Sequence, residues 1–144
     1  MVKYNIHFED NKKEAAYRTL INPKQISRLK VKIVNIIQKK KKYKDKEYSA
    51  KRLAEELETN TRYISAAVKI GFDMNYSSFV NKCRIDAAIA LLKDKRNKRL
   101  KMEDVGDIVG FSNRQSFYAA FYKFTGLTPK QFKQNMEREN AEEK

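Results

Sequence analysis

Apolar residues recur at three- and four-residue intervals along most of this chain, which is the spacing of an amphipathic α-helix. Stretches that alternate between apolar and polar residues, as strands do, are few. The 144 residues include only four glycines and two prolines, so little in the sequence interrupts a helix. The pattern predicts an all-α fold of about seven helices.

The first helical pattern begins at Pro23 and runs to about Lys41. Its apolar positions are Ile26, Leu29, Ile33, Val34, Ile36 and Ile37. Pro23 suits the first turn of a helix, because the amide hydrogen that it lacks has no helical partner there. Asn22-Pro23 marks a break in the pattern, and we interpret residues 1–22 as an N-terminal arm whose structure the pattern leaves open.

Two short helices and a long one follow, over about residues 49–57, 61–70 and 75–93. Ser49 is placed to cap the first of them. The apolar positions are Leu53, Ala54 and Leu57, then Ile64, Ala67 and Val68, and then Phe79, Val80, Cys83, Ala87, Leu91 and Leu92. At 1.5 Å per residue, the long helix spans about 28 Å.

Three more helices are predicted over about residues 102–110, 114–126 and 129–138. The positions expected to face inward are Val105, Val109, Phe111, Phe117 and Phe121. Gly110 supplies the turn between the first two of these helices, and Thr128-Pro129 begins the last one. We therefore expect one domain over residues 23–138, followed by an acidic tail over residues 139–144.

Two parts of the chain, about residues 49–70 and 103–124, repeat one plan. The repeated positions are Leu53 and Val105, Ala54 and Gly106, Leu57 and Val109, and Ile64 and Phe117. Each part combines a short helix that has a small residue at its second core position, a tight turn and a second helix. This is the helix-turn-helix arrangement, in which the small residue lets the two helices cross closely. The sequence predicts two such subdomains joined by the long helix.

The dimensions of DNA give this arrangement a function. A major groove about 12 Å wide admits one helix, and the second helix of each unit, the recognition helix, is the one that enters it. Two units on one chain reach adjacent major-groove segments when they are about 34 Å apart, one turn of DNA. The long helix has a suitable length for this separation.

The charge balance also favours a polyanionic partner. Lys and Arg outnumber Asp and Glu by 32 to 18, which gives a formal net charge of +14. Nucleic acid is the first candidate for such a chain, and an anionic membrane surface is the second. No apolar run approaches the roughly 18 residues that cross a bilayer, and the N-terminus lacks the apolar core of a signal peptide. We expect a cytoplasmic protein.

Motifs of enzymes and metal sites do not occur in the sequence. It has no glycine-rich phosphate loop, no Gly-x-Ser-x-Gly motif and no cluster with metal-ligand spacing. The single cysteine, Cys83, lies in a helical pattern and is interpreted as a packing residue. We expect no catalytic residue, no metal and no cofactor.

Four motifs in the second half of the chain carry a resemblance to a known family. They are Arg84-Ile85-Asp86-Ala87-Ala88, Val105-Gly106-Asp107-Ile108-Val109-Gly110-Phe111, the run from Phe117 to Phe121, and Gly126-Leu127-Thr128-Pro129-Lys130-Gln131-Phe132. On these motifs, residues 29–134 resemble the DNA-binding domain of the AraC/XylS family of bacterial transcription regulators. The resemblance implies double-stranded DNA as a partner and RNA polymerase as a contact of the bound protein. Relatives usually sense effectors through a separate domain, so no effector ligand is expected within this chain.

Three departures from the family pattern stand out. Gly106 replaces a usual Ala and is expected to loosen its helix by up to about 1 kcal/mol. Asp73 replaces a usual Gly before the long helix, and Asp tolerates a left-handed conformation better than most residues do. Ala66 and Ala119 stand where many relatives carry larger base-contacting side chains.

The candidates for DNA contact on the first recognition helix lie off its Ile64, Ala67 and Val68 core. They are Thr61, Arg62, Ser65, Ala66 and Lys69. Arg62 suits a bidentate contact with guanine, although it also fits a solvated cation at the helix start, and Ala66 suits a thymine methyl group. Thr61 and Ser65 suit a base or a phosphate, and Lys69 suits a phosphate.

The equivalent face of the second recognition helix carries Arg114, Gln115, Tyr118 and Ala119. Gln115 suits adenine and Arg114 suits guanine or phosphate, while Tyr118 fits either DNA contact or partial packing. Further phosphate candidates are Lys123, Lys130 and Lys133, and the helix that starts at Pro129 presents free amide groups to an anion. The runs Lys39–Lys42 and Lys95–Lys101 are weaker candidates for phosphate contact, because charge runs of this kind usually form solvated helix ends and loops.

These observations favour a sequence-specific DNA-binding transcription regulator. The same charge also fits a non-specific or architectural nucleic-acid binder, whose affinity would depend steeply on salt but little on sequence. A third alternative is that the chain is the output fragment of a larger sensor protein. A membrane surface is disfavoured, because the apolar faces are better explained as the cores of two helical bundles.

Overall fold

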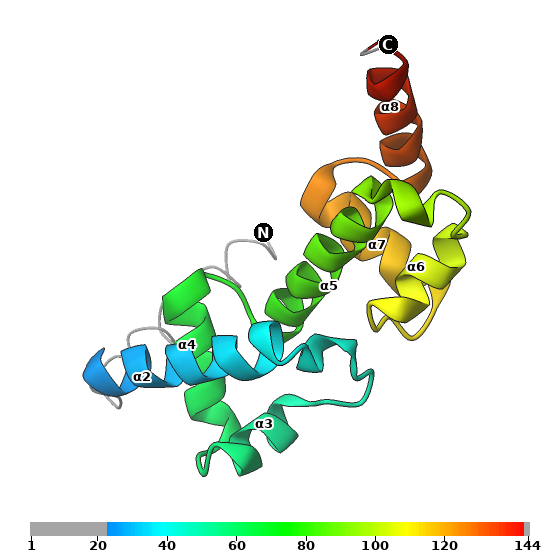
Figure 1. The fold of residues 1–144 in the computed structure, drawn as a ribbon. Coiled ribbons are helices and arrows are strands. Elements are labelled where there is room, and N and C mark those ends of the chain that lie inside the picture. Colours follow the sequence, from blue (N-terminus) through cyan, green and yellow to red (C-terminus); the bar gives the residue numbers. More distant parts are fainter. Residues whose placement is uncertain (1–22, 143–144) are drawn as a thin grey trace, which may run out of the picture. The chain divides into compact units, whose positions relative to one another are not determined.

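The computed structural model describes residues 23–142, and this part of the chain forms seven α-helices and no strand (Figure 1). The helices are α2 (Pro23–Val34), α3 (Ala50–Glu56), α4 (Thr61–Phe72), α5 (Tyr76–Lys93), α6 (Met102–Ile108), α7 (Arg114–Thr125) and α8 (Pro129–Glu142). The predicted all-α fold of seven helices is confirmed. The predicted N-terminal arm and the last two residues of the predicted tail lie outside the described residues, and α8 continues into that tail as far as Glu142.

The described chain divides into two compact units. The first combines the residues up to Lys42 with Glu47–Phe79, and the second combines Tyr43–Lys46 with the residues from Val80 onward. Helices α2, α3 and α4 belong to the first unit, and α6, α7 and α8 belong to the second. Helix α5 contributes its first residues to the first unit and the remainder to the second.

In the first unit, α2 and α3 both pack against α4. The buried apolar residues of these three helices are Ile26, Ile33, Leu53, Ala54, Ile64, Ala66, Ala67 and Val68. The helix predicted to run to Lys41 ends earlier, because Asn35–Lys39 form a π-helical turn that is closed by the Lys40 amide donating to the Asn35 carbonyl at 2.9 Å. This wider turn buries both Ile36 and Ile37.

Tyr48 fixes the entry into α3. Its hydroxyl donates a hydrogen bond to Glu56 Oε2 at 2.5 Å, and its carbonyl accepts one from the Tyr76 hydroxyl at 3.3 Å. The Arg52 guanidinium lies 5.3 Å from the centre of the Tyr48 ring. Burial and the hydrogen bond to Glu56 raise the pKa of Tyr48 above its usual value.

The second unit has an aromatic core. The predicted inward residues are all buried: Val105, Val109, Phe111, Phe117 and Phe121. The Phe117 ring centre lies 5.3 Å from that of Phe111 and 5.9 Å from that of Phe121. The face of α5 differs in part from the prediction, since Ile85 and Ala88 are buried whereas Ala87, Leu91 and Leu92 are only partly buried at the edge of this core.

The short segment Tyr43–Lys46 packs on the α6–α7 turn of the second unit. Arg84 Nε donates to the Tyr43 carbonyl at 2.7 Å, and Lys46 forms an ion pair with Asp107. Gly110 has φ +110°, and a Cβ atom there would lie 2.5 Å from the Tyr43 carbonyl oxygen. Only glycine therefore fits this turn, for both its backbone conformation and its contact with the segment.

Candidate nucleic-acid interface

The two predicted helix-turn-helix units share one backbone plan. A helix of 7 residues precedes one of 12 in both, as α3 and α4 and as α6 and α7. The turn residues Glu58 and Gly110 both have positive φ, at 56° and 110°. The amide after each turn residue donates back into the first helix, from Thr59 to Ala54 at 2.8 Å and from Phe111 to Gly106 at 3.0 Å.

The caps of the two second helices also match. The Asn60 side chain accepts a hydrogen bond from the Tyr63 amide at 3.0 Å, and the Asn113 side chain accepts one from the Ser116 amide at 2.8 Å. Both helices end at a left-handed residue, Asp73 in α4 and Gly126 in α7. Asp73, which replaces the usual glycine, thus adopts the left-handed conformation that was expected at this position.

The structure explains why position 106 is glycine rather than alanine, which the sequence did not reveal. A Cβ atom at this position would lie 2.7 Å from Cδ2 and 2.9 Å from Cγ of the buried Phe117 ring. At the equivalent positions of the first unit, Ala54 stands with Ile64, which has no ring. The aromatic side chain of the second unit therefore takes the space that a methyl group at position 106 would need, whereas the first unit holds the Ala54 methyl group at the equivalent position.

The first recognition helix, α4, exposes the residues at its start. Thr61 and Arg62 are exposed, and Ser65 and Lys69 are half-buried. Lys69 Nζ lies 3.5 Å from the Asp73 carboxylate, which partly offsets its charge. All four candidates therefore lie where a ligand can reach them.

The prediction for Ala66 is wrong. Ala66 is 0% exposed, so its methyl group is part of the protein core and cannot contact a thymine. Helix α4 packs against both α2 and α3, so its buried face is broader than the stripe of Ile64, Ala67 and Val68 from which the face was inferred.

The second recognition helix, α7, exposes Arg114, Gln115 and Ala119, and Tyr118 is half-buried. The Arg114 guanidinium lies 4.8 Å from the centre of the Tyr118 ring, and its Nη1 lies 3.7 Å from Glu103 Oε1 of α6. Tyr118 in turn meets Phe117 edge-on at 5.8 Å. The aromatic core thus supports Tyr118, and Tyr118 supports the arginine at the start of the helix.

Two exposed tyrosines were not predicted as site residues. Tyr122 of α7 is 60% exposed and Tyr63 of α4 is 36% exposed. Helical spacing could have identified Tyr122, because it lies four residues after Tyr118 and eight after Arg114. Tyr63 gives no such signal, since it neighbours the buried Ile64 in a short helix.

The remaining phosphate candidates lie at the end of α7 and on α8. Lys123 and Lys130 are exposed, and Lys133 is half-buried. The start of α8 carries a capping box in which the Gln131 amide donates to Thr128 Oγ1 at 3.1 Å and the Thr128 amide donates to Gln131 Oε1 at 3.0 Å. The prediction of a helix start at Thr128-Pro129 is confirmed.

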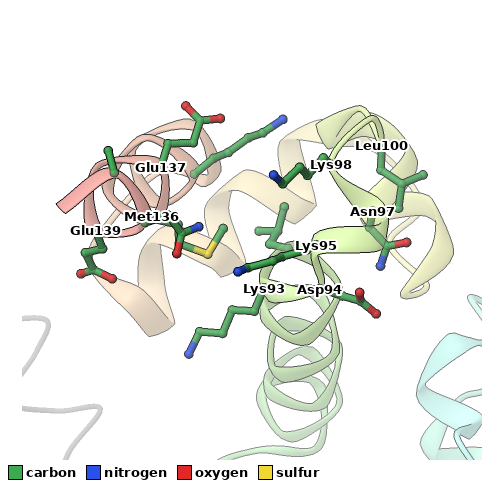
Figure 2. A pocket seen from close by; sticks show the side chains of 13 residues that line it. Lys93, Asp94, Lys95, Asn97, Lys98, Leu100, Met136, Glu137 and Glu139 are labelled. Atoms are coloured by element: carbon green, nitrogen blue, oxygen red, sulfur yellow. The ribbon is translucent and has the colours of Figure 1, made fainter. Parts of the chain in front are cut away.

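Lys133 lines a pocket of about 550 Å³. This pocket lies between α8, the end of α5 and the loop that follows it (Figure 2). Leu92, Leu100 and Met136 contribute apolar surface to this pocket. The charged residues that line it are Lys93, Lys95, Lys98, Lys133, Asp94, Glu137 and Glu139. Four cations and three carboxylates nearly balance, so the pocket is not a strongly basic surface. Arg96 lowers the pKa of Asp94 to about 2 through hydrogen bonds, which keeps that carboxylate charged.

Cys83 is buried, as the prediction of a packing residue requires. Burial raises the pKa of its thiol to about 11, so the reactive thiolate is scarce at neutral pH. Residues 23–142 contain no group of three or more His, Cys, Asp or Glu side chains that could hold a metal ion. No helix in that same part of the chain is both long and apolar enough to cross a membrane.

A family profile described as a helix-turn-helix domain matches residues 53–135, which include both units found in the structure. The chain belongs to the AraC-type helix-turn-helix family. It carries a DNA-binding domain of the kind found in transcription regulators, and the predicted resemblance to AraC/XylS proteins is confirmed. Among curated proteins, no sequence matches this AraC-type chain.

Three solved structures are similar to the AraC-type domain. The C-terminal domain of the two-component response regulator yesN from Fusobacterium nucleatum is 29% identical, with a TM-score of 0.61 over 70% of this chain and 93% of that one. The C-terminal domain of AraT, a response regulator from Geobacillus stearothermophilus, is 23% identical, with a TM-score of 0.63 over 76% and 84%. A DNA-binding transcriptional dual regulator from Escherichia coli is 18% identical, with a TM-score of 0.61 over 74% and 96%.

Proposed function

We propose that this chain regulates transcription by binding a specific sequence in double-stranded DNA, with α4 and α7 each entering a major groove. The observation that carries the proposal is the repeated unit. Both units have the same helix lengths, a left-handed residue in the turn and an Asn cap, and both leave polar residues exposed at the start of the second helix.

In this proposal, base contacts come from the first two turns of each recognition helix. Thr61, Arg62 and Ser65 are the base-contact candidates on α4, and Arg114, Gln115, Tyr118 and Ala119 are those on α7. The arginines suit guanine and Gln115 suits adenine, because each matches the donor and acceptor pattern of that base in the major groove. Lys69, Lys123, Lys130 and Lys133 would contribute phosphate contacts, which give affinity and register without sequence preference.

Selection of bound duplexes from a random pool tests the proposal directly. We expect recovery of a motif with two parts, one for each recognition helix. Recovery of no motif, together with a steep dependence of affinity on salt, would instead identify a non-specific nucleic-acid binder.

Substitution of the two arginines tests the assignment of residues. Arg62→Ala and Arg114→Ala should each lower affinity for the selected duplex by about 5- to 100-fold and relax base preference in a different part of the motif. Arg138→Ala removes an exposed arginine of α8 and serves as the matched control. Uniform weakening with unchanged base preference in both arginine variants would contradict the assignment, and quantitative footprinting on base-substituted duplexes distinguishes the two results.

We further propose that the bound protein contacts RNA polymerase. Transcription in a purified system, from a promoter that carries the selected motif, should change when the protein is added. A change that persists when the motif is moved far from the promoter would count against direct contact.

A further inference from the structure

The region from Pro23 to Lys44 is the most one-sided stretch of charge in the chain. Nine of its 22 residues are Lys or Arg, and none is Asp or Glu. Elsewhere in the described chain, basic side chains often lie beside carboxylates, as in the pairs Lys82–Asp86 and Arg96–Asp94. The positive charge of this region therefore has no acidic neighbours along its own sequence to offset it.

The structure places this charge on one side of a helix. The apolar residues of α2 and the π-helical turn face inward, and Ile26, Ile33, Ile36 and Ile37 are buried. The basic residues on the other side are exposed. We define the basic face of α2 as Arg28 and Lys32 of the helix together with Lys39 and Lys40 at the end of the π-helical turn that continues it. Within residues 23–142, no carboxylate forms an ion pair with any of these four side chains.

Helix α2 is also the direct neighbour of the first recognition helix, α4, against which it packs. Packed helices have axes about 8–10 Å apart, and a major groove is about 12 Å wide. A helix packed on the flank of α4 would lie beside the sugar–phosphate backbone that borders the groove when α4 occupies it. Lys and Arg side chains are the usual donors to such phosphates.

We propose that the basic face of α2 binds the phosphate backbone of the DNA beside the groove that α4 enters. This inference rests on the proposed function, because it assumes that α4 is a recognition helix. The basic face adds affinity without base preference and extends the protected DNA on the side of the first unit. An anionic membrane is a poorer partner, because the apolar side chains that would enter a bilayer are buried against the protein, and Val31 is the large apolar side chain of α2 that is exposed.

The test compares two variants that lose the same charge. One carries Arg28→Gln, Lys32→Gln, Lys39→Gln and Lys40→Gln, and the control carries Lys93→Gln, Lys95→Gln, Lys98→Gln and Arg138→Gln. Affinity for the selected duplex is measured over a range of salt concentrations, since each phosphate contact contributes about 0.9 to the slope of log affinity against log salt. We expect the slope to fall by about 3.6 in the basic-face variant and by less than about 1 in the control. The selected motif should be unchanged and the footprint shortened at one end.

Equal slopes in the two variants would overturn the proposal. The salt slopes of the two variants can also be compared on a duplex of arbitrary sequence. If selection from the random pool recovers no motif, the proposed function is rejected, but this comparison still tests phosphate contact by the basic face of α2. The double variant Arg28→Gln and Lys32→Gln, with an expected slope change of about 2, replaces the fourfold variant if thermal unfolding shows that the latter is not folded. Binding to phosphatidylglycerol vesicles is measured as well. If the unmodified chain binds these vesicles as tightly as DNA, and the basic-face variant does not bind them, the choice of DNA as the partner is overturned.

Discussion

Ala66 and Ala119 occupy equivalent positions in the two recognition helices, yet Ala66 is buried and Ala119 is exposed. A small side chain is compatible with either environment, so residue type alone does not distinguish them. The helices that cover each position decide the outcome, and these differ, because α2 and α3 pack against α4 whereas α6 and α8 pack against α7. Base contact by Ala119 therefore stays open, whereas base contact by Ala66 is excluded.

This difference predicts opposite effects of one substitution. Ala66→Leu should lower the free energy of unfolding by about 1–3 kcal/mol, because the larger side chain must enter a filled core. Ala119→Leu should change it by no more than about 0.5 kcal/mol, while altering affinity for the selected duplex. Urea unfolding measures the first quantity and fluorescence anisotropy measures the second. Similar stability losses in the two variants would show that α7 is covered at Ala119.

Tyr118 is predicted to orient Arg114 rather than only to pack. Tyr118→Leu removes the ring beneath the guanidinium and should weaken binding of the selected duplex by about 2- to 5-fold, in line with an exposed cation–π contact. Tyr118→Phe keeps the ring and should therefore lose less affinity than Tyr118→Leu, whether or not the hydroxyl also contacts a base. Anisotropy titrations of both variants, with circular dichroism to confirm folding, check this order. Equal losses in both variants would mean that the Tyr118 hydroxyl itself contacts DNA.

At the scale of elements, the sequence predicted the helices better than their faces. Helix starts were predictable where a capping residue was present, as at Ser49 and Thr128. The face of α5 was harder, because this helix contributes to the cores of both units and no single apolar stripe describes it. Ile85 was therefore missed, although it is 1% exposed. A pattern along one helix contains no information about which neighbours cover it.

Gly106 illustrates the same limit and gives a prediction for the α6–α7 pair. From sequence alone, Gly106→Ala should strengthen the helix by about 1 kcal/mol. The Phe117 ring opposes this gain, because the new Cβ atom would lie 2.7 Å from Cδ2, and overpacking of this kind costs about 1–3 kcal/mol. We expect a net loss of stability of about 1 kcal/mol, measured by urea unfolding.

A double variant tests the cause of this loss. Phe117→Ile introduces the residue that stands at the equivalent position of the first unit, Ile64. Gly106→Ala should then cost less in the Phe117→Ile background than in the unmodified chain, with a coupling energy of about 0.5–2 kcal/mol. A gain of stability for Gly106→Ala alone would show that the Phe117 ring has room to move.

At the scale of the whole molecule, the chain carries two units of one plan, and a single chain that holds two DNA-binding units gains affinity from their linkage. The prediction concerns the spacing of the selected motif. Insertion of 5 base pairs between its two parts rotates one part by about half a turn of the duplex. We expect affinity to fall to about that of a duplex that contains only one part, since both units can no longer bind at once.

Substitutions separate this effect from a general loss of binding. On the duplex with the insertion, Arg62→Ala and Arg114→Ala should not both lower the affinity, because only one recognition helix binds its part of the motif at a time. On the unmodified duplex both should weaken binding. Unchanged affinity after the insertion would mean that one unit provides all of the sequence preference and that the other contributes only phosphate contacts or none. Anisotropy titrations of the unmodified chain and the two arginine variants on both duplexes give all of these comparisons. They are made at one salt concentration, because phosphate contacts make every affinity depend on salt.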